Sequence, residues 1–183
     1  MLNWAYIASE IAYEGWFAVS KISIIGSGAV GCIVGEGFKQ LGHKVIFYDT
    51  DRDRIRLLEK HSEATRDMHY AVHQTEFPFL TVPTPTKDGE LDPSDIISAT
   101  RALGQALRNK AGYHIVVIKS TVLPGTTEHK LIPILETESG RKAGVNIGVC
   151  VNPEFLTQLQ STWSDDTSYA KHFFNQDRVV IGE

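Results

Sequence analysis

The segment KISIIGSGAVG, residues 21–31, places a glycine-rich turn directly after a run of β-branched residues and before a helical pattern. Gly26 permits a tight turn, Gly28 lets the backbone approach a pyrophosphate, and Gly31 allows close packing of helix on strand. The helix N-terminus offers unpaired N–H groups to phosphate oxygens. The segment therefore predicts a dinucleotide-binding loop, with a purely structural glycine turn as the alternative.

An acidic residue follows at the distance that such a loop requires. Asp49 ends the next β-rich run, roughly 20 residues beyond the glycines. A carboxylate there can accept both hydroxyls of the adenosine ribose and would repel a 2′-phosphate. The sequence thus favours NAD over NADP. Arg52 and Arg54 follow closely, and we expect both to be solvated helix positions.

Short apolar runs and longer helical patterns alternate along the rest of the chain. Strands are predicted at 21–25, 44–48, 77–82, 114–118, 145–151 and 178–181, and helices at 29–41, 51–60, 68–73, 92–109 and 126–135. Near-continuous apolar strands between helices are typical of a parallel sheet covered on both faces. We therefore expect an α/β fold, a doubly wound, mostly parallel Rossmann sheet, forming a single domain over residues 21–183.

Composition excludes several classes of protein. The net charge of −4 argues against a nucleic-acid partner, which would favour a basic surface. Cys32 and Cys150 are too few for a disulfide framework, so we expect a reducing, cytoplasmic location. Both are expected to be packing residues, and no metal site is expected.

Residues 1–20 form an apolar extension interrupted by Glu10 and Glu14 and preceded by no lysine or arginine. This pattern fits neither a secretory signal nor a membrane span. Its apolar residues recur at roughly helical spacing. We expect a short amphipathic helix packed on the domain or on a partner chain, with an upstream start site as the alternative.

Three further segments rich in polar and turn-forming residues lie at the ends of predicted strands, at residues 82–92, 119–127 and 152–158. Each taken alone could be a turn, a helix cap or a solvated loop. Open α/β sheets bind ligands at the carboxyl ends of their strands. Their shared position therefore predicts one composite site.

The series GSGAVG, VPTPT, KSTVLPGTT, NPEFL and DRVVIG resembles, in order and spacing, the NAD domain of the UDP-glucose/GDP-mannose 6-dehydrogenase family. The resemblance covers residues 21–182. It implies oxidation of a sugar C6 alcohol to a carboxylate with two NAD molecules in succession, through a cysteine thiolate that captures the aldehyde. It also implies a role in polysaccharide biosynthesis.

The resemblance also implies residue roles. Catalytic roles fall on Thr121, which faces the reaction centre, and on Glu154, a general base for thioester hydrolysis. Sugar-nucleotide contacts fall on Asn152, Phe155, Leu156 and Thr157. The residues implied in NAD binding are Gly26, Gly28, Ala29, Val30, Gly31, Asp49, Val82, Pro83, Thr84, Ser120 and Thr121.

The sequence ends at Glu183, before the family's cysteine motif would be reached. We expect the NAD half of a nucleotide-sugar dehydrogenase that acts on a UDP- or GDP-sugar only if another polypeptide supplies the thiol. The isolated chain is then expected to be inactive. The alternatives are a non-catalytic NAD(H)-binding module and a truncated gene product.

Overall fold

The computed structural model of the protein describes residues 19–154 and 180–182. Residues 1–18 of the predicted N-terminal helix lie outside these residues. So do Phe155, Leu156 and Thr157, and the first half of the strand predicted at 178–181. Within the described residues, no helix is long and apolar enough to cross a bilayer.

A six-stranded sheet in the order β3-β2-β1-β4-β7-β8 forms the centre of the domain. Every neighbouring pair of its strands is parallel. The strands are β1 (Lys21–Ile25), β2 (Lys44–Tyr48), β3 (Glu63–Thr65), β4 (Phe77–Leu80), β7 (Ile115–Ile118) and β8 (Gly148–Val151). The strand order reverses between β1 and β4, which is where such sheets bind dinucleotides. The predicted Rossmann fold is confirmed.

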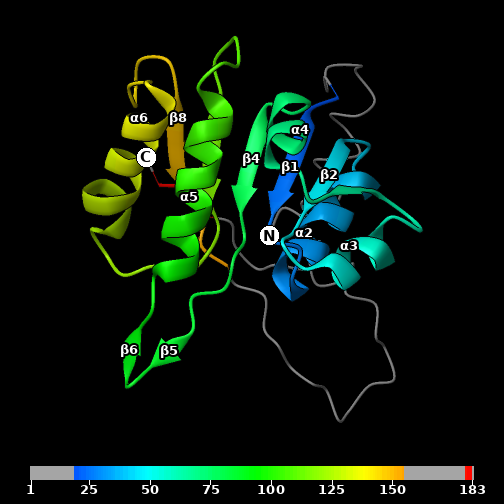
Figure 1. Ribbon diagram of the computed structural model, residues 1–183, viewed down its shortest axis with the longest axis horizontal. Coiled ribbons are helices and arrows are strands. Elements are labelled where there is room, and N and C mark those ends of the chain that lie inside the picture. The colour runs from blue at the N-terminus through cyan, green and yellow to red at the C-terminus, as the bar shows by residue number, and fades with distance from the viewer. Residues whose placement is uncertain (1–18, 155–179, 183) are drawn as a thin grey trace, which may run out of the picture.

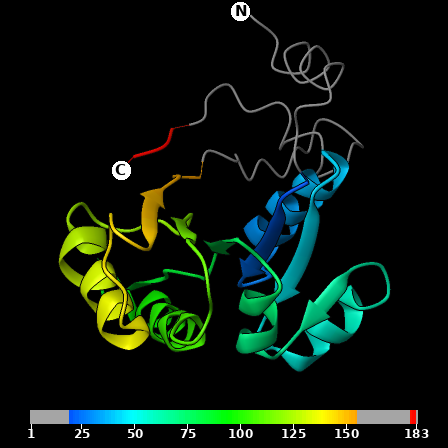
Figure 2. The same ribbon diagram turned by 90° about the horizontal axis from the view of Figure 1, so that it is seen from above.

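Helices cover both faces of this sheet (Figures 1 and 2). They are α2 (Ala29–Gln40), α3 (Arg52–Leu58), α4 (Met68–His73), α5 (Ser94–Leu107) and α6 (Ile132–Ser139), and the π-helical turn η1 (Thr127–Leu131) leads directly into α6. Strand side chains alternate between the two faces. Ile25 and Leu80 pack with α4, α5 and α6, whereas the preceding residues, Ile24 and Phe79, pack with α2.

Helix boundaries follow from local chemistry. The Asp51 carboxylate caps α3 by accepting hydrogen bonds from the N–H groups of Asp53 at 2.9 Å and Arg54 at 3.2 Å. Asp67 caps α4 in the same way, from the N–H of Tyr70. At the other end of a helix, α6 stops at Gly140, whose φ of 70° suits glycine.

Two elements were missed by the sequence analysis. The strand β3 has only three residues and lies at a sheet edge, so it carries almost no apolar signal. The hairpin of β5 (Thr86–Lys87) and β6 (Glu90–Leu91) projects beyond the carboxyl ends of the strands (Figure 1). Its turn is formed by Asp88 and Gly89 with φ of 52° and 84°, and an Asp-Gly pair is a strong hairpin signal.

Two predicted boundaries were wrong by three residues or more. The strand predicted at 145–151 begins only at Gly148, because the N–H of Val145 turns back to the carbonyl of Lys142. The helix predicted at 126–135 continues to Ser139, because the left-handed residue that ends it is Gly140.

Candidate dinucleotide-binding site

A cleft of about 520 Å³ opens at the carboxyl ends of β1, β2 and β4. The glycine loop, the residues after β2 and the first two turns of α5 form its walls. Its lining residues are Ile25, Gly26, Gly28, Tyr48, Asp49, Thr50, Asp51, Arg54, Met68, Val82, Pro83, Asp95, Ser98, Ala99 and Ala102. The lining thus combines three carboxylates, those of Asp49, Asp51 and Asp95, with apolar side chains from β1, α4 and α5.

Each of the three glycines in the loop occupies a different structural environment. Gly26 adopts a φ of 100°, which strongly favours glycine. A Cβ on Gly31 would lie 2.2 Å from the carbonyl oxygen of Gly26, so α2 could not begin where it does. A Cβ on Gly28, in contrast, would meet nothing within 4 Å. Gly28 thus borders open space at the start of α2, beside Ala29 and Val30.

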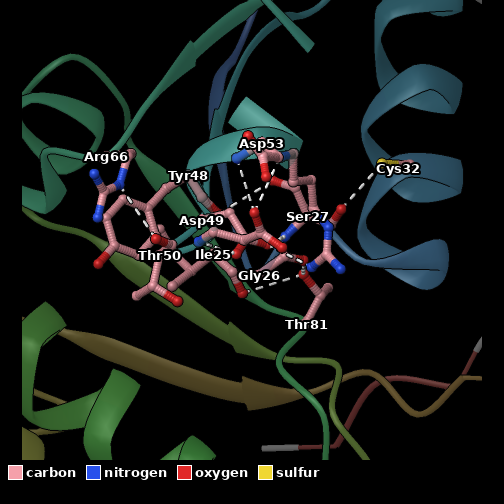
Figure 3. Close-up of polar contacts among 12 residues, drawn as sticks. Ile25, Gly26, Ser27, Cys32, Tyr48, Asp49, Thr50, Asp53, Arg66 and Thr81 are labelled. Atoms are coloured by element: carbon pink, nitrogen blue, oxygen red, sulfur yellow. Dashed lines mark hydrogen bonds and ion pairs between the residues drawn. The ribbon is translucent and has the colours of Figure 1, made fainter. Parts of the chain in front are cut away.

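Asp49 lies beside this loop and is nearly buried, with 8% of its side chain exposed. Its Oδ2 accepts a hydrogen bond of 2.8 Å from the N–H of Ser27, and its Oδ1 accepts one of 2.9 Å from the N–H of Asp51 (Figure 3). The carboxylate therefore bridges the turn after β1 and the turn after β2. Asp49 lines the cleft, and its role as an acceptor of ribose hydroxyls stays a prediction.

Arg54 is an exposed helix position, as expected, but it also pairs with Asp49, which was not predicted. Its Nη1 lies 2.9 Å from Oδ2 of Asp49, and its side chain lines the cleft while 44% exposed. The hydrogen bond to Asp49 raises the pKa of the guanidinium. Arg54 lies in the first turn of α3, five residues after Asp49 in the sequence. Arg52 is exposed, as expected.

The loop after β4 approaches the same cleft through Val82 and Pro83. Thr84 is half-buried and does not line the cleft. Ser120, the second residue after β7, is buried, and its hydroxyl donates to the carbonyl of Val82 at 2.7 Å. The next residue, Thr121, is exposed. The loops after β4 and β7 are thus tied together, with Thr121 on the open side.

A buried ion pair joins β7 to the residues after β8. Nζ of Lys119 lies 3.0 Å from Oε2 of Glu154, and the two side chains are only 4% and 11% exposed. The same ammonium donates to Oδ1 of Asn152 at 3.1 Å, while Nδ2 of Asn152 donates to the carbonyl of Val180 at 2.9 Å. Glu154 is therefore a held carboxylate rather than a solvated one. Sequence analysis did not single out Lys119, although it directly precedes Ser120.

The cysteines do not form part of this cleft. Burial raises the pKa of the Cys32 thiol, whose Sγ lies 3.2 Å from the carbonyl oxygen of Ser27. Cys150, in β8, packs against the cluster that includes Phe79 and Val117. Among residues 19–154 and 180–182, no group of three His, Cys, Asp or Glu side chains is arranged to hold a metal ion.

Residues 59–183 match the family model described as UDP-glucose/GDP-mannose dehydrogenase family, NAD binding domain. The chain belongs to the UDP-glucose/GDP-mannose dehydrogenase family. Family members bind NAD, and the matched region is their NAD-binding domain.

Curated relatives in this family agree with that match. GDP-mannose 6-dehydrogenase of Pseudomonas syringae pv. syringae is 37% identical over 160 residues, which cover 75% of this chain and 36% of that protein. UDP-glucose 6-dehydrogenase AglM of Haloferax volcanii is 34% identical over 183 residues, covering 88% of this chain and 40% of the relative. The chain thus spans 36–40% of the length of these dehydrogenases.

Solved structures of family members have the same fold. A ternary complex of GDP-mannose dehydrogenase from Pseudomonas aeruginosa superposes with a TM-score of 0.81 at 34% identity, over 88% of this chain and 40% of that one. UDP-glucose dehydrogenase from Pyrobaculum islandicum gives 0.76 at 32% identity, over 90% of this chain and 41% of that one.

Proposed function

We propose that this chain binds NAD in the cleft at the carboxyl ends of β1, β2 and β4, and that it serves a nucleotide-sugar 6-dehydrogenase. The observation that carries the proposal is the position of Asp49, whose carboxylate lies 2.8 Å from the Ser27 N–H inside the glycine loop. In this proposal residues 21–183 form one NAD-binding domain and residues 1–20 a helical extension.

The residues of the cleft fit a dinucleotide. Gly28 borders open space at the N-terminus of α2, where the helix dipole and free N–H groups favour a pyrophosphate. Asp49 can accept ribose hydroxyls, since a carboxylate has about four lone-pair sites and can accept more hydrogen bonds than those it now makes. The apolar wall that includes Ala99 and Ala102 suits the adenine ring.

The proposed reaction oxidises the CH–OH of a UDP- or GDP-sugar to a carboxylate in two successive two-electron steps. Two NAD molecules, bound one after the other, would each accept one hydride from the sugar carbon. Thr121, exposed after β7, would face the reacting carbon, and Glu154 would accept a proton from the hydrolytic water. Asn152 holds the start of the segment in which Phe155, Leu156 and Thr157 would contact the sugar nucleotide. A cysteine thiol would complete the site.

Titration calorimetry with NAD and NADP tests the cofactor assignment. We expect the wild-type chain to bind NAD at least about tenfold more tightly, because a carboxylate next to the added phosphate is unfavourable. The variant Asp49→Ala should lose affinity for NAD and bind NADP relatively better. Its Arg54 guanidinium would no longer be paired and could meet the phosphate.

The matched control is Asp53→Ala, which removes an exposed carboxylate from α3 that does not line the cleft. This variant should keep the wild-type preference. Equal binding of both cofactors by the wild type would show that the role given to Asp49 is wrong. Failure of the folded chain to bind either cofactor would remove the proposed function itself.

A further inference from the structure

Thr81 is a buried threonine that directly follows β4 and has no part in the cofactor fingerprint. Its hydroxyl lies 2.7 Å from the carbonyl oxygen of Gly26 and 3.2 Å from that of Ile25 (Figure 3). Its own N–H donates to the carbonyl of Ile25 at 2.9 Å. Thr81 therefore binds the turn after β1 with both its backbone and its side chain.

The peptide groups of Gly26 are held from two sides. From the β2 side, the carbonyl of Tyr48 accepts the Gly26 N–H at 2.9 Å, and Asp49 accepts the next N–H, that of Ser27. From the β4 side, the Thr81 hydroxyl donates to the Gly26 carbonyl. The direction of the chain as it enters the glycine loop is thus set by contacts from the ends of both neighbouring strands.

The Gly26 carbonyl lies where the loop and the start of α2 are closely packed. A Cβ on Gly31 would lie 2.2 Å from the Gly26 oxygen and 2.9 Å from the Thr81 hydroxyl. The Gly26 carbonyl is therefore enclosed between the first turn of α2 and Thr81, where little water can replace a lost donor. Leaving a buried carbonyl without a hydrogen bond costs more free energy than a typical hydrogen bond contributes to stability. Without the Thr81 hydroxyl, the loop would therefore shift to give the Gly26 carbonyl another donor.

We propose that Thr81 is a positioning residue for the dinucleotide: its hydroxyl fixes the Gly26 carbonyl and so places Gly28 and the N-terminus of α2 for the pyrophosphate. This inference rests on the proposed binding of NAD. Thr81 does not itself touch the cofactor in this arrangement. Its effect on affinity passes through the backbone of residues 26–28.

The test compares Thr81→Val with Thr81→Ser in the full chain, using NAD titration calorimetry and thermal unfolding. Valine keeps the shape of threonine without its hydroxyl, whereas serine keeps the hydroxyl. Thr81→Val should bind NAD about five- to tenfold more weakly, which corresponds to about 1–1.4 kcal/mol. Thr81→Ser should stay within about twofold of wild type, even though it loses a buried methyl group.

A matched control is Thr75→Val, at the opposite edge of the sheet. Thr75 is also buried, and its hydroxyl donates to the carbonyl of Ala71 at 2.8 Å. This control should lower Tm without changing NAD affinity. If Thr81→Val does not fold, Thr81→Ala removes the same hydroxyl and is compared with Thr81→Ser in its place.

Three results would overturn the inference. The first is that Thr81→Val binds NAD as tightly as the wild-type chain does. The proposed function would then remain intact. The second is an equal loss of affinity in Thr75→Val, because general destabilisation would then explain both. The third is absence of NAD binding by the wild type, which removes the proposed function as well.

Discussion

At the scale of single residues, the carboxyl edge of the sheet is organised by buried polar side chains with matched partners. Asp49 holds the loops after β1 and β2, Thr81 holds the loop after β1 from β4, and Lys119 holds the residues after β8. Each of these contacts links the carboxyl ends of two neighbouring strands. Because these groups are enclosed, water cannot readily replace a hydrogen bond that a substitution removes.

The Lys119–Glu154 pair should therefore be strongly coupled to stability. Lys119→Met should lower the free energy of unfolding by about 3–5 kcal/mol, since it breaks an ion pair whose two side chains are nearly buried. Adding Glu154→Gln to that variant should recover part of the loss. Urea denaturation followed by circular dichroism measures both effects.

The same substitution at Lys142 is the control. Lys142 pairs with Glu136 at 2.9 Å, but its side chain is 70% exposed. Exposed pairs contribute little, so Lys142→Met should hardly change stability. Equal losses in the two lysine variants, or no recovery in the double variant, would contradict the assigned role of the buried pair.

At the scale of elements, two glycines one turn apart allow α2 to pack closely against the sheet. A Cβ on Gly35 would lie 2.3 Å from Cε1 of Phe47, a fully buried ring in β2. Gly31 plays the same part against the Gly26 carbonyl, one helical turn earlier. The start of α2, and with it the N–H groups that face the cleft, thus depends on this close approach.

Gly35→Ala and Gly28→Ala should separate packing from binding. Gly35→Ala should destabilise the domain by about 1–3 kcal/mol despite the better helix propensity of alanine, because Phe47 has little room to move. Gly28→Ala should leave stability almost unchanged, since its Cβ meets nothing within 4 Å. It should nevertheless weaken NAD binding, because the methyl group enters the space proposed for the pyrophosphate.

Thermal unfolding and NAD titration of both variants check this pair of expectations. A stable Gly35→Ala variant would mean that α2 can shift away from β2 at little cost. Unchanged NAD affinity in Gly28→Ala would place the pyrophosphate elsewhere in the cleft.

At the scale of the whole molecule, the amino edge of the sheet is held by cationic side chains bound to backbone carbonyls. Arg141 donates to the carbonyls of Leu107, Gly112 and Asn146, joining the end of α5 to the segment before β8. Burial lowers the pKa of Lys110 to about 8. His114 lies buried nearby, directly before β7.

The stability of the domain should fall in mild acid because of His114. Burial lowers the pKa of its imidazole, and the positive charges of Lys110 and Arg141 lower it further. Its Nδ1 has no hydrogen-bond partner among the described residues. The unfolded chain therefore takes up a proton at a higher pH than the folded chain does. Stability should be full above about pH 6.5 and decline as the pH falls below it.

Urea denaturation at a series of pH values between about 7 and 5 measures this slope. His114→Phe should flatten it by removing the titrating group. The same substitution at the exposed His61 serves as the control and should leave the wild-type slope in place. An unchanged slope in His114→Phe would assign the acid sensitivity to other groups.

Local spacing along the sequence was sufficient to predict most of the fold. The strands at 21–25 and 44–48 and the helix at 68–73 occur as predicted, because apolar runs, caps and glycines act within a few residues of one another. The glycine loop and Asp49 were predicted for the same reason, since their spacing follows from one strand–helix–strand unit. Elements with little apolar content, such as β3, left too weak a pattern.

The partners of the site residues, in contrast, depend on the tertiary structure. Thr81 reaches Gly26 across 55 positions of sequence, and the Lys119 ammonium reaches Asn152 across 33. These contacts arise because the parallel sheet brings the carboxyl ends of β1, β4, β7 and β8 to one edge. The local sequence around either partner does not indicate that the two residues are in contact. The sequence alone therefore determined the family, the sheet and the loops. Only the fold decided that Arg54 pairs with Asp49 and that Glu154 is held by a buried lysine.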